Sequence, residues 1–153
     1  MFRTKLLPLL GLAAVAFAAA QNASAQALTC STRALNGAYG YTVTGSITSA
    51  FGPLVVGPFA AVGRIVFDGQ GHVKTVRSLS NNGEVLTNDS GSGTYQVNSD
   101  CTGSFNISVG PPNGSITLNL NLVLDDTDQI RAIVTNPGTV LSLEGRKQLP
   151  IMF

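Results

Sequence analysis

The chain has 153 residues, with 9 basic and 8 acidic side chains and a formal net charge of +1 at pH 7. Charged residues make up only 11% of it, which excludes an electrostatic nucleic-acid binder, because such a protein needs a basic stripe to displace counterions. The length corresponds to one domain with enough chain to bury its own core.

The first 25 residues have the three zones of a secretory signal peptide. Arg3 and Lys5 form a positive head, residues 6–20 form an apolar run, and residues 21–25 are small and polar. The apolar run is shorter than the roughly 20 residues that a membrane-spanning helix needs. Residues 23–25 read Ala-Ser-Ala, which fits a signal-peptidase site. The sequence therefore predicts a signal peptide over residues 1–25.

The mature chain, residues 26–153, is predicted to be a single all-β domain exported to the periplasm or the extracellular space. Without Arg3 and Lys5 it has 7 basic and 8 acidic residues. An even pair of cysteines in an exported chain indicates a disulfide between Cys30 and Cys101. Two free thiols are the alternative.

Turn-forming residues interrupt this domain at short intervals. Clusters of Gly, Pro, Asn and Asp recur from residue 49 onward, and these residues accept or pre-set turn dihedrals. Short strands at such regular spacing indicate a β-sandwich or a barrel. The β-rich segments between the turns lie at about 37–48, 59–67, 72–80, 90–97, 102–109, 115–124, 129–135 and 140–147.

Apolar and polar residues alternate along the later segments. Leu118 and Leu120 share one face while Thr117 and Asn119 share the other. Period two with one apolar face is typical of an antiparallel sheet that is wetted on one side. The residues predicted to face inward are Tyr95, Val97, Phe105, Ile107, Leu118, Leu120, Leu122, Ala132, Val134, Leu141 and Leu143.

The last hairpin can be assigned a register. If residues 136–139 form its loop, Arg131 faces Glu144 and Ala132 faces Leu143. This register pairs both aliphatic residues and opposite charges, whereas a one-residue slip would exchange the faces. Arg131 and Glu144 are thus predicted on the solvent face.

Eight consecutive strands with short connections predict an antiparallel up-and-down barrel, since closure leaves no open sheet edge. A barrel of eight strands either fills itself with side chains or holds one small ligand. Glycines within the segments, such as Gly63 and Gly93, suit strongly bent strands. A β-sandwich built from the same strands is the alternative.

Three stretches carry a family resemblance: residues 35–39 (Leu-Asn-Gly-Ala-Tyr), residues 67–73 (Phe-Asp-Gly-Gln-Gly-His-Val) and residues 93–103, which end in Asp-Cys-Thr-Gly. Together they resemble a group of exported bacterial proteins of unknown function, and the match in spacing covers most of residues 30–147. The resemblance implies a calycin-like or allene-oxide-cyclase-like barrel. Allene oxide cyclases use an acidic residue in an apolar barrel to cyclise a fatty-acid epoxide. Glu144 is predicted on the polar face here, so that activity is not carried over.

No catalytic or metal-binding constellation stands out in the sequence. His72, the single histidine, follows a Gly-rich turn, and its sequence neighbours supply neither a nucleophile nor an orienting group. Asp125, Asp126 and Asp128 form the densest acidic cluster. We interpret it as a turn between strands, with calcium binding as the alternative.

Arg64, Arg77 and Arg131 are scattered along the chain, and we expect them on the surface. We also expect no stable membrane insertion after signal cleavage. The chain ends in Phe, as outer-membrane barrels often do, but Pro150 interrupts the terminal alternation and the sequence lacks Trp for aromatic girdles.

Three functions remain open at this point: a soluble barrel that binds a small apolar molecule, an interaction or structural protein of the envelope or extracellular space with a packed interior, and an isomerase or cyclase acting in an apolar pocket. A hollow interior would separate the first and third from the second. We expect no cofactor and no metal. For the first function, the predicted ligand contacts are Tyr95, Phe105, Leu118, Leu120, Leu122, Leu141 and Leu143.

Cleavage is predicted between Ala25 and Gln26. Amino-terminal sequencing of the exported protein should then read Gln-Ala-Leu-Thr-Cys. A mature form that retains Met1 would contradict the signal-peptide assignment.

Overall fold

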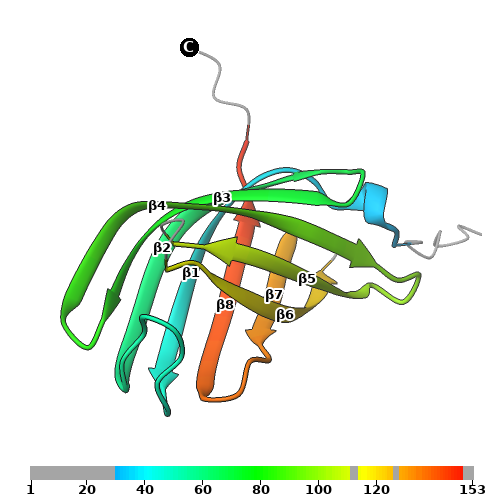
Figure 1. Ribbon diagram of the computed structural model, residues 1–153. Coiled ribbons are helices and arrows are strands. Elements are labelled where there is room, and N and C mark those ends of the chain that lie inside the picture. The colour runs from blue at the N-terminus through cyan, green and yellow to red at the C-terminus, as the bar shows by residue number, and fades with distance from the viewer. Residues whose placement is uncertain (1–29, 111–113, 126–127, 150–153) are drawn as a thin grey trace, which may run out of the picture.

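A computed structural model describes residues 30–110, 114–125 and 128–149. The predicted signal segment and its cleavage site lie outside these residues. Eight antiparallel strands form a closed up-and-down barrel in which each strand pairs with the next and β8 pairs with β1 (Figure 1). The predicted barrel is confirmed, and the sandwich alternative is wrong. The elements are η1 (Thr32–Ala34, a 3-10 turn), β1 (Asn36–Ile47), β2 (Gly57–Asp68), β3 (His72–Asn81), β4 (Glu84–Val97), β5 (Thr102–Val109), β6 (Ile116–Asp125), β7 (Gln129–Val134) and β8 (Thr139–Lys147).

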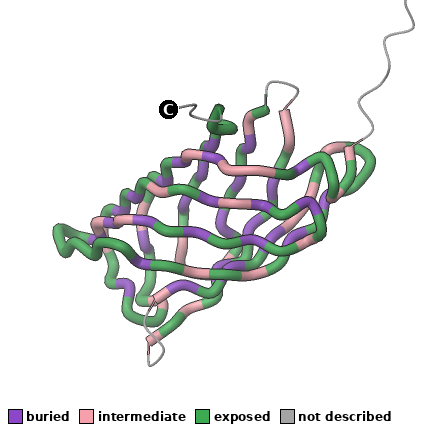
Figure 2. Tube along the Cα trace, turned by 90° about the horizontal axis from the view of Figure 1, so that it is seen from above, coloured by how far each residue is buried: buried purple, intermediate pink, exposed green. Residues whose placement is uncertain are grey.

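Buried and exposed residues alternate along the strands (Figure 2). All of the apolar residues predicted to face inward are buried, which confirms that face assignment. The described residues include no helix that is long and apolar enough to cross a membrane.

The register of the last hairpin is also confirmed. Arg131 lies opposite Glu144 and Ala132 opposite Leu143, and both charged residues are exposed. The ion pair that Arg131 makes is nevertheless with Asp125. Arg131 also lies opposite Val123 on β6, so Asp125, two residues further along that strand, is its diagonal neighbour on the same face.

Strand β4 is longer than predicted, because it begins at Glu84 and not near residue 90. Asn82 and Gly83 have positive φ angles of 50° and 92°, the pattern of a two-residue hairpin turn of type I′, which lets the next strand start at once. Further along β4, Asn88 has a φ of 56° and the register with β3 shifts by one residue. This shift is a β-bulge, which redirects the side chains that follow it.

One end of the barrel is closed by the chain entering it. The disulfide between Cys30 and Cys101 is present and ties the segment before η1 to the turn between β4 and β5. The phenolic oxygen of Tyr95 donates to the backbone oxygen of Leu35 at 2.6 Å. The ring of Phe67 makes edge contacts with Tyr39, Tyr95 and Phe105. These aromatic rings fill the closed end.

Reduction of the disulfide should destabilise the fold. The bridge joins residues 71 positions apart, and the loss of loop-closure entropy in the unfolded chain is worth about 4 kcal/mol for a loop of this length. Urea denaturation with and without reductant measures the difference, with Cys30→Ser as a second route to the same state. Equal unfolding midpoints in all three samples would contradict a stabilising role.

Candidate functional site

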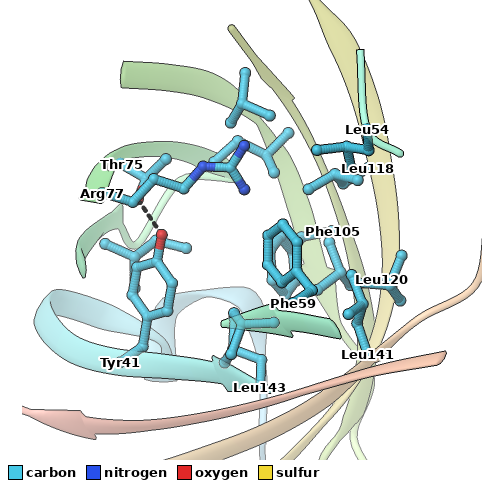
Figure 3. A pocket seen from close by; sticks show the side chains of 15 residues that line it. Tyr41, Leu54, Phe59, Thr75, Arg77, Phe105, Leu118, Leu120, Leu141 and Leu143 are labelled. Atoms are coloured by element: carbon cyan, nitrogen blue, oxygen red, sulfur yellow. Dashed lines mark hydrogen bonds between the residues drawn. The ribbon is translucent and has the colours of Figure 1, made fainter. Parts of the chain in front are cut away.

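The barrel interior is almost filled. A cavity of about 30 Å³ remains inside it, room for about one or two water molecules. Figure 3 shows Phe59 of β2 and Phe105 of β5 in this space, with Tyr41 and Arg77 at its polar side. The lining residues are Tyr41, Val43, Leu54, Phe59, Ile65, Thr75, Arg77, Phe105, Ile107, Val109, Leu118, Leu120, Val134, Leu141 and Leu143.

The residues predicted to contact a ligand are therefore divided. Phe105, Leu118, Leu120, Leu141 and Leu143 line the small interior cavity. The other two, Tyr95 and Leu122, are buried away from it. The hydroxyl of Tyr95 is already bonded to backbone oxygens of the entering chain. Ligand contact by these seven residues stays a prediction.

A larger space lies at the opposite end of the barrel from the disulfide. This cleft, which we call the mouth, has a volume of about 340 Å³, within the roughly 300–1,000 Å³ range of small-molecule sites. It lies between the β1–β2 loop, the β3–β4 hairpin and the ends of β5 and β6. Leu54, Arg77 and Val109 line both the mouth and the interior cavity. The remaining described residues of the mouth are Pro53, Leu79, Asn81, Glu84, Val85, Leu86, Asp89, Gly110, Gly114 and Ile116.

A buried ion pair forms the floor of the mouth. The Nε of Arg77 donates to Oδ2 of Asp89 at 2.9 Å, with the two side chains 6% and 4% exposed. The other carboxylate oxygen of Asp89 accepts from the backbone N–H of Gly110 at 2.8 Å. The prediction of a surface position for Arg77 is wrong. Arg64 and Arg131, for which the same position was predicted, are exposed as expected.

Local backbone features explain why these charged side chains point inward. Arg77 lies two residues after Thr75 and four after Val73 on β3. Alternate residues of a strand face the same side, so all three side chains face the barrel interior. Gly63 lies opposite Arg77 on one side and Tyr41 on the other. A Cβ at Gly63 would come within 2.9 Å of atoms in both side chains, so the glycine leaves the space that they occupy.

The bulge on β4 sets the position of Asp89. Leu86 lies opposite Leu79, whereas Asp89 lies opposite Arg77, so β4 has one extra residue between these pairs. Without this extra residue, the side chain of residue 89 would point to the outer face of the barrel instead of the interior. The inward direction of Arg77 can be read from the sequence. Val73 pairs with Phe67 across the β2–β3 turn, and Arg77, four residues after Val73, lies on the same face of β3. The bulge has no comparable sequence signal.

A second buried polar pair, Tyr41 and Thr75, lies next to Arg77 in the barrel interior. The Tyr41 hydroxyl and Thr75 Oγ1 are 2.9 Å apart, and Thr75 donates its own proton to the backbone oxygen of Arg64. Tyr41 is therefore the donor in the Tyr41–Thr75 bond. Burial raises the pKa of Tyr41, and the Thr75 bond partly offsets this rise. The phenol is neutral at physiological pH.

The expectation that His72 lacks an orienting group is wrong. Its Nδ1 lies 2.8 Å from Oδ2 of Asp68, while Oδ1 of Asp68 accepts the backbone N–H groups of His72 and Gln70. The backbone bonds, that of His72 first, lower the pKa of Asp68 to about 2. The imidazole is exposed, with the His72 side chain 70% accessible. These bonds hold the β2–β3 turn together, which is a structural role.

Two described acidic residues of the cluster around residue 126 each pair with a different basic side chain. Asp125 bonds with Arg131, and Asp128 lies 3.5 Å from the Nζ of Lys147; Asp126 lies outside the described residues. Within the described part of the chain, no group of three or more His, Cys, Asp or Glu side chains could hold a metal ion.

No protein-family profile, characterised protein or solved structure matches this chain. The structure establishes the barrel topology, while the resemblance to calycin-like and allene-oxide-cyclase-like barrels stays a prediction. Function has to be inferred from the chemistry of the mouth.

Removing one partner of the Arg77–Asp89 pair should lower the free energy of unfolding substantially. Asp89→Leu would leave the guanidinium buried without its counter-charge, and we expect a loss of about 3–5 kcal/mol in unfolding free energy. The double variant Arg77→Met with Asp89→Leu should recover most of that loss. Glu144→Gln, at an exposed site, should change stability by less than about 1 kcal/mol. Urea denaturation provides the comparison, and similar losses at positions 89 and 144 would contradict the burial of the pair.

Proposed function

We propose that this protein is an exported barrel that binds a small apolar molecule at its mouth. The observation that carries the proposal is the cleft of about 340 Å³, which combines apolar walls with a few buried polar groups. Small-molecule sites generally have this composition. Leu54, Leu79 and Val109, all buried or nearly so, supply apolar wall.

The mouth is a better candidate than the interior on grounds of volume. The interior cavity of about 30 Å³ is too small for a ten-carbon molecule unless side chains move, and cores as densely packed as protein interiors resist such movement. The two cavities share Leu54, Arg77 and Val109. A ligand in the mouth would therefore rest on the filled core below it.

Export is part of the proposal. It is supported by the charge, apolar and small-residue zones of residues 1–25. The Cys30–Cys101 disulfide agrees with it, because disulfides persist in oxidising compartments.

An interaction protein of the envelope or extracellular space is the second candidate. The filled interior favours it, as do apolar residues on the outer face of β2 and β3. Val62 and Val76 are 59% and 52% exposed, and they are diagonal neighbours because Val76 lies opposite Arg64. Exposed apolar surface of this kind marks contact sites when it is contiguous.

An isomerase or cyclase has weaker support. It needs an acid or base that can exchange a proton with a substrate. Asp89 is the buried acid of the mouth, and each of its oxygens already accepts a hydrogen bond from Arg77 or Gly110. The pair is therefore better suited to holding a ligand than to transferring its protons.

Thermal titration with butylbenzene, a ten-carbon hydrocarbon, tests the proposal. A ligand at 100 times its dissociation constant stabilises the folded state by about 2.7 kcal/mol, which raises the melting temperature of a domain this size by several degrees. The exported, processed protein should show a saturable rise of this kind. If neither butylbenzene nor a fluorescent apolar probe shifts the melt, the interaction-protein alternative is favoured.

A matched pair of tryptophan variants locates the site. Leu86→Trp adds bulk at the mouth, where Leu86 is 44% exposed, and should weaken butylbenzene binding about tenfold, a change of about 1.4 kcal/mol. Val76→Trp adds the same bulk to the outer face of β3, which does not line the mouth, and should leave binding unchanged. Equal weakening in both variants would contradict binding at the mouth.

A further inference from the structure

Arg77 has hydrogen-bonding capacity that the described residues do not use. Its side chain is 6% exposed, and its bond to protein is from Nε to Asp89. No fully buried side-chain nitrogen or oxygen among the described residues lacks a partner. The two terminal nitrogens of Arg77 have no hydrogen-bond partner among the described residues, so they are reached from the adjoining cavities. Figure 3 shows the guanidinium extending across the pocket towards Leu118. The donors thus point into the interior cavity, which shares Arg77 with the mouth.

The charge of Arg77 is already balanced. Asp89 lies 2.9 Å from it and is equally buried. Glu84 also lines the mouth, so the described lining has two acidic side chains and one basic side chain. A ligand carboxylate would add a further negative charge to a poorly solvated site, which is unfavourable. A ligand ammonium group brings only donors, so it could contact Glu84 but could not satisfy the terminal nitrogens of Arg77.

We propose that the ligand of the mouth is a neutral molecule with a carbonyl oxygen that accepts hydrogen bonds from the terminal nitrogens of Arg77. This inference rests on the proposed function, and it names the chemical class of the ligand. A carbonyl oxygen has two lone pairs and brings no donor of its own. It satisfies the free guanidinium N–H groups without adding charge, while the apolar remainder of the ligand lies against Leu79 and Val109.

Four ligands with the same ten-carbon phenylbutyl skeleton test this class: butylbenzene, 4-phenyl-2-butanone, 4-phenylbutanoate and 4-phenylbutylamine. Competition against a fluorescent apolar probe at pH 7 gives their dissociation constants. We expect the ketone to bind about tenfold more tightly than the hydrocarbon, the scale of a hydrogen bond to a charged group. The carboxylate and the amine should both bind more weakly than the ketone.

Two variants connect the preference to the ion pair. Asp89→Asn removes the counter-charge while keeping a side chain of similar shape, so the carboxylate should become the tightest ligand of the series. The double variant Arg77→Met with Asp89→Leu removes both charges, and the ratio of ketone to hydrocarbon affinity should fall to about one. Arg131→Met, which removes an exposed arginine far from the mouth lining, is the matched control and should keep the wild-type order.

The outcomes separate the two proposals. If all four compounds bind with similar affinity, or if the carboxylate binds tightest to the unaltered protein, the ligand class is wrong while binding at the mouth stands. If the ketone preference survives the double variant, Arg77 is not the group that recognises it, and the inference fails. If no compound binds, both proposals fail.

Discussion

A guanidinium enclosed in a barrel of eight strands has to be neutralised close by, because an isolated buried charge is very costly. Asp89 does this for Arg77 from the neighbouring strand. Several backbone features accommodate the pair: the bulge on β4 sets the facing of Asp89, Gly63 leaves room beside Arg77, and the N–H of Gly110 completes the carboxylate's bonds. The shape and polarity of the mouth depend on this one interaction.

The two ends of the barrel differ in how completely side chains fill them. At the closed end, the disulfide at Cys30 and the ring of Phe67 with its aromatic neighbours use space that could otherwise hold a ligand. At the open end, the β3–β4 hairpin, the β1–β2 loop and the ends of β5 and β6 surround a cleft that side chains leave partly empty. A filled core below an open mouth is a rigid base for a site, because dense packing resists rearrangement.

The alternation of apolar and polar residues was sufficient to predict the barrel, because each strand has one solvent-exposed face and one buried face. The alternation around Leu120 and the register of Arg131 opposite Glu144 follow directly from that constraint. The site was harder to predict, because it depends on departures from regular pairing. Strand parity with Val73 places Arg77 inside, against the usual preference of arginine for the surface. The partner of Arg77 could not be found this way, since the bulge before Asp89 changes the facing of β4.

Stability alone does not account for a charged pair at this position. Replacing a buried ion pair with apolar side chains of similar volume is often neutral or stabilising. Leu54 and Val109 line the same two cavities as Arg77, so the surroundings of the pair are largely apolar. The terminal nitrogens of the guanidinium also have no acceptor among residues 30–110, 114–125 and 128–149, so these residues do not use their full hydrogen-bonding capacity. A ligand oxygen in the mouth would recover it. The polarity of the mouth is thus better explained by the ligand that we propose than by the folding of the barrel.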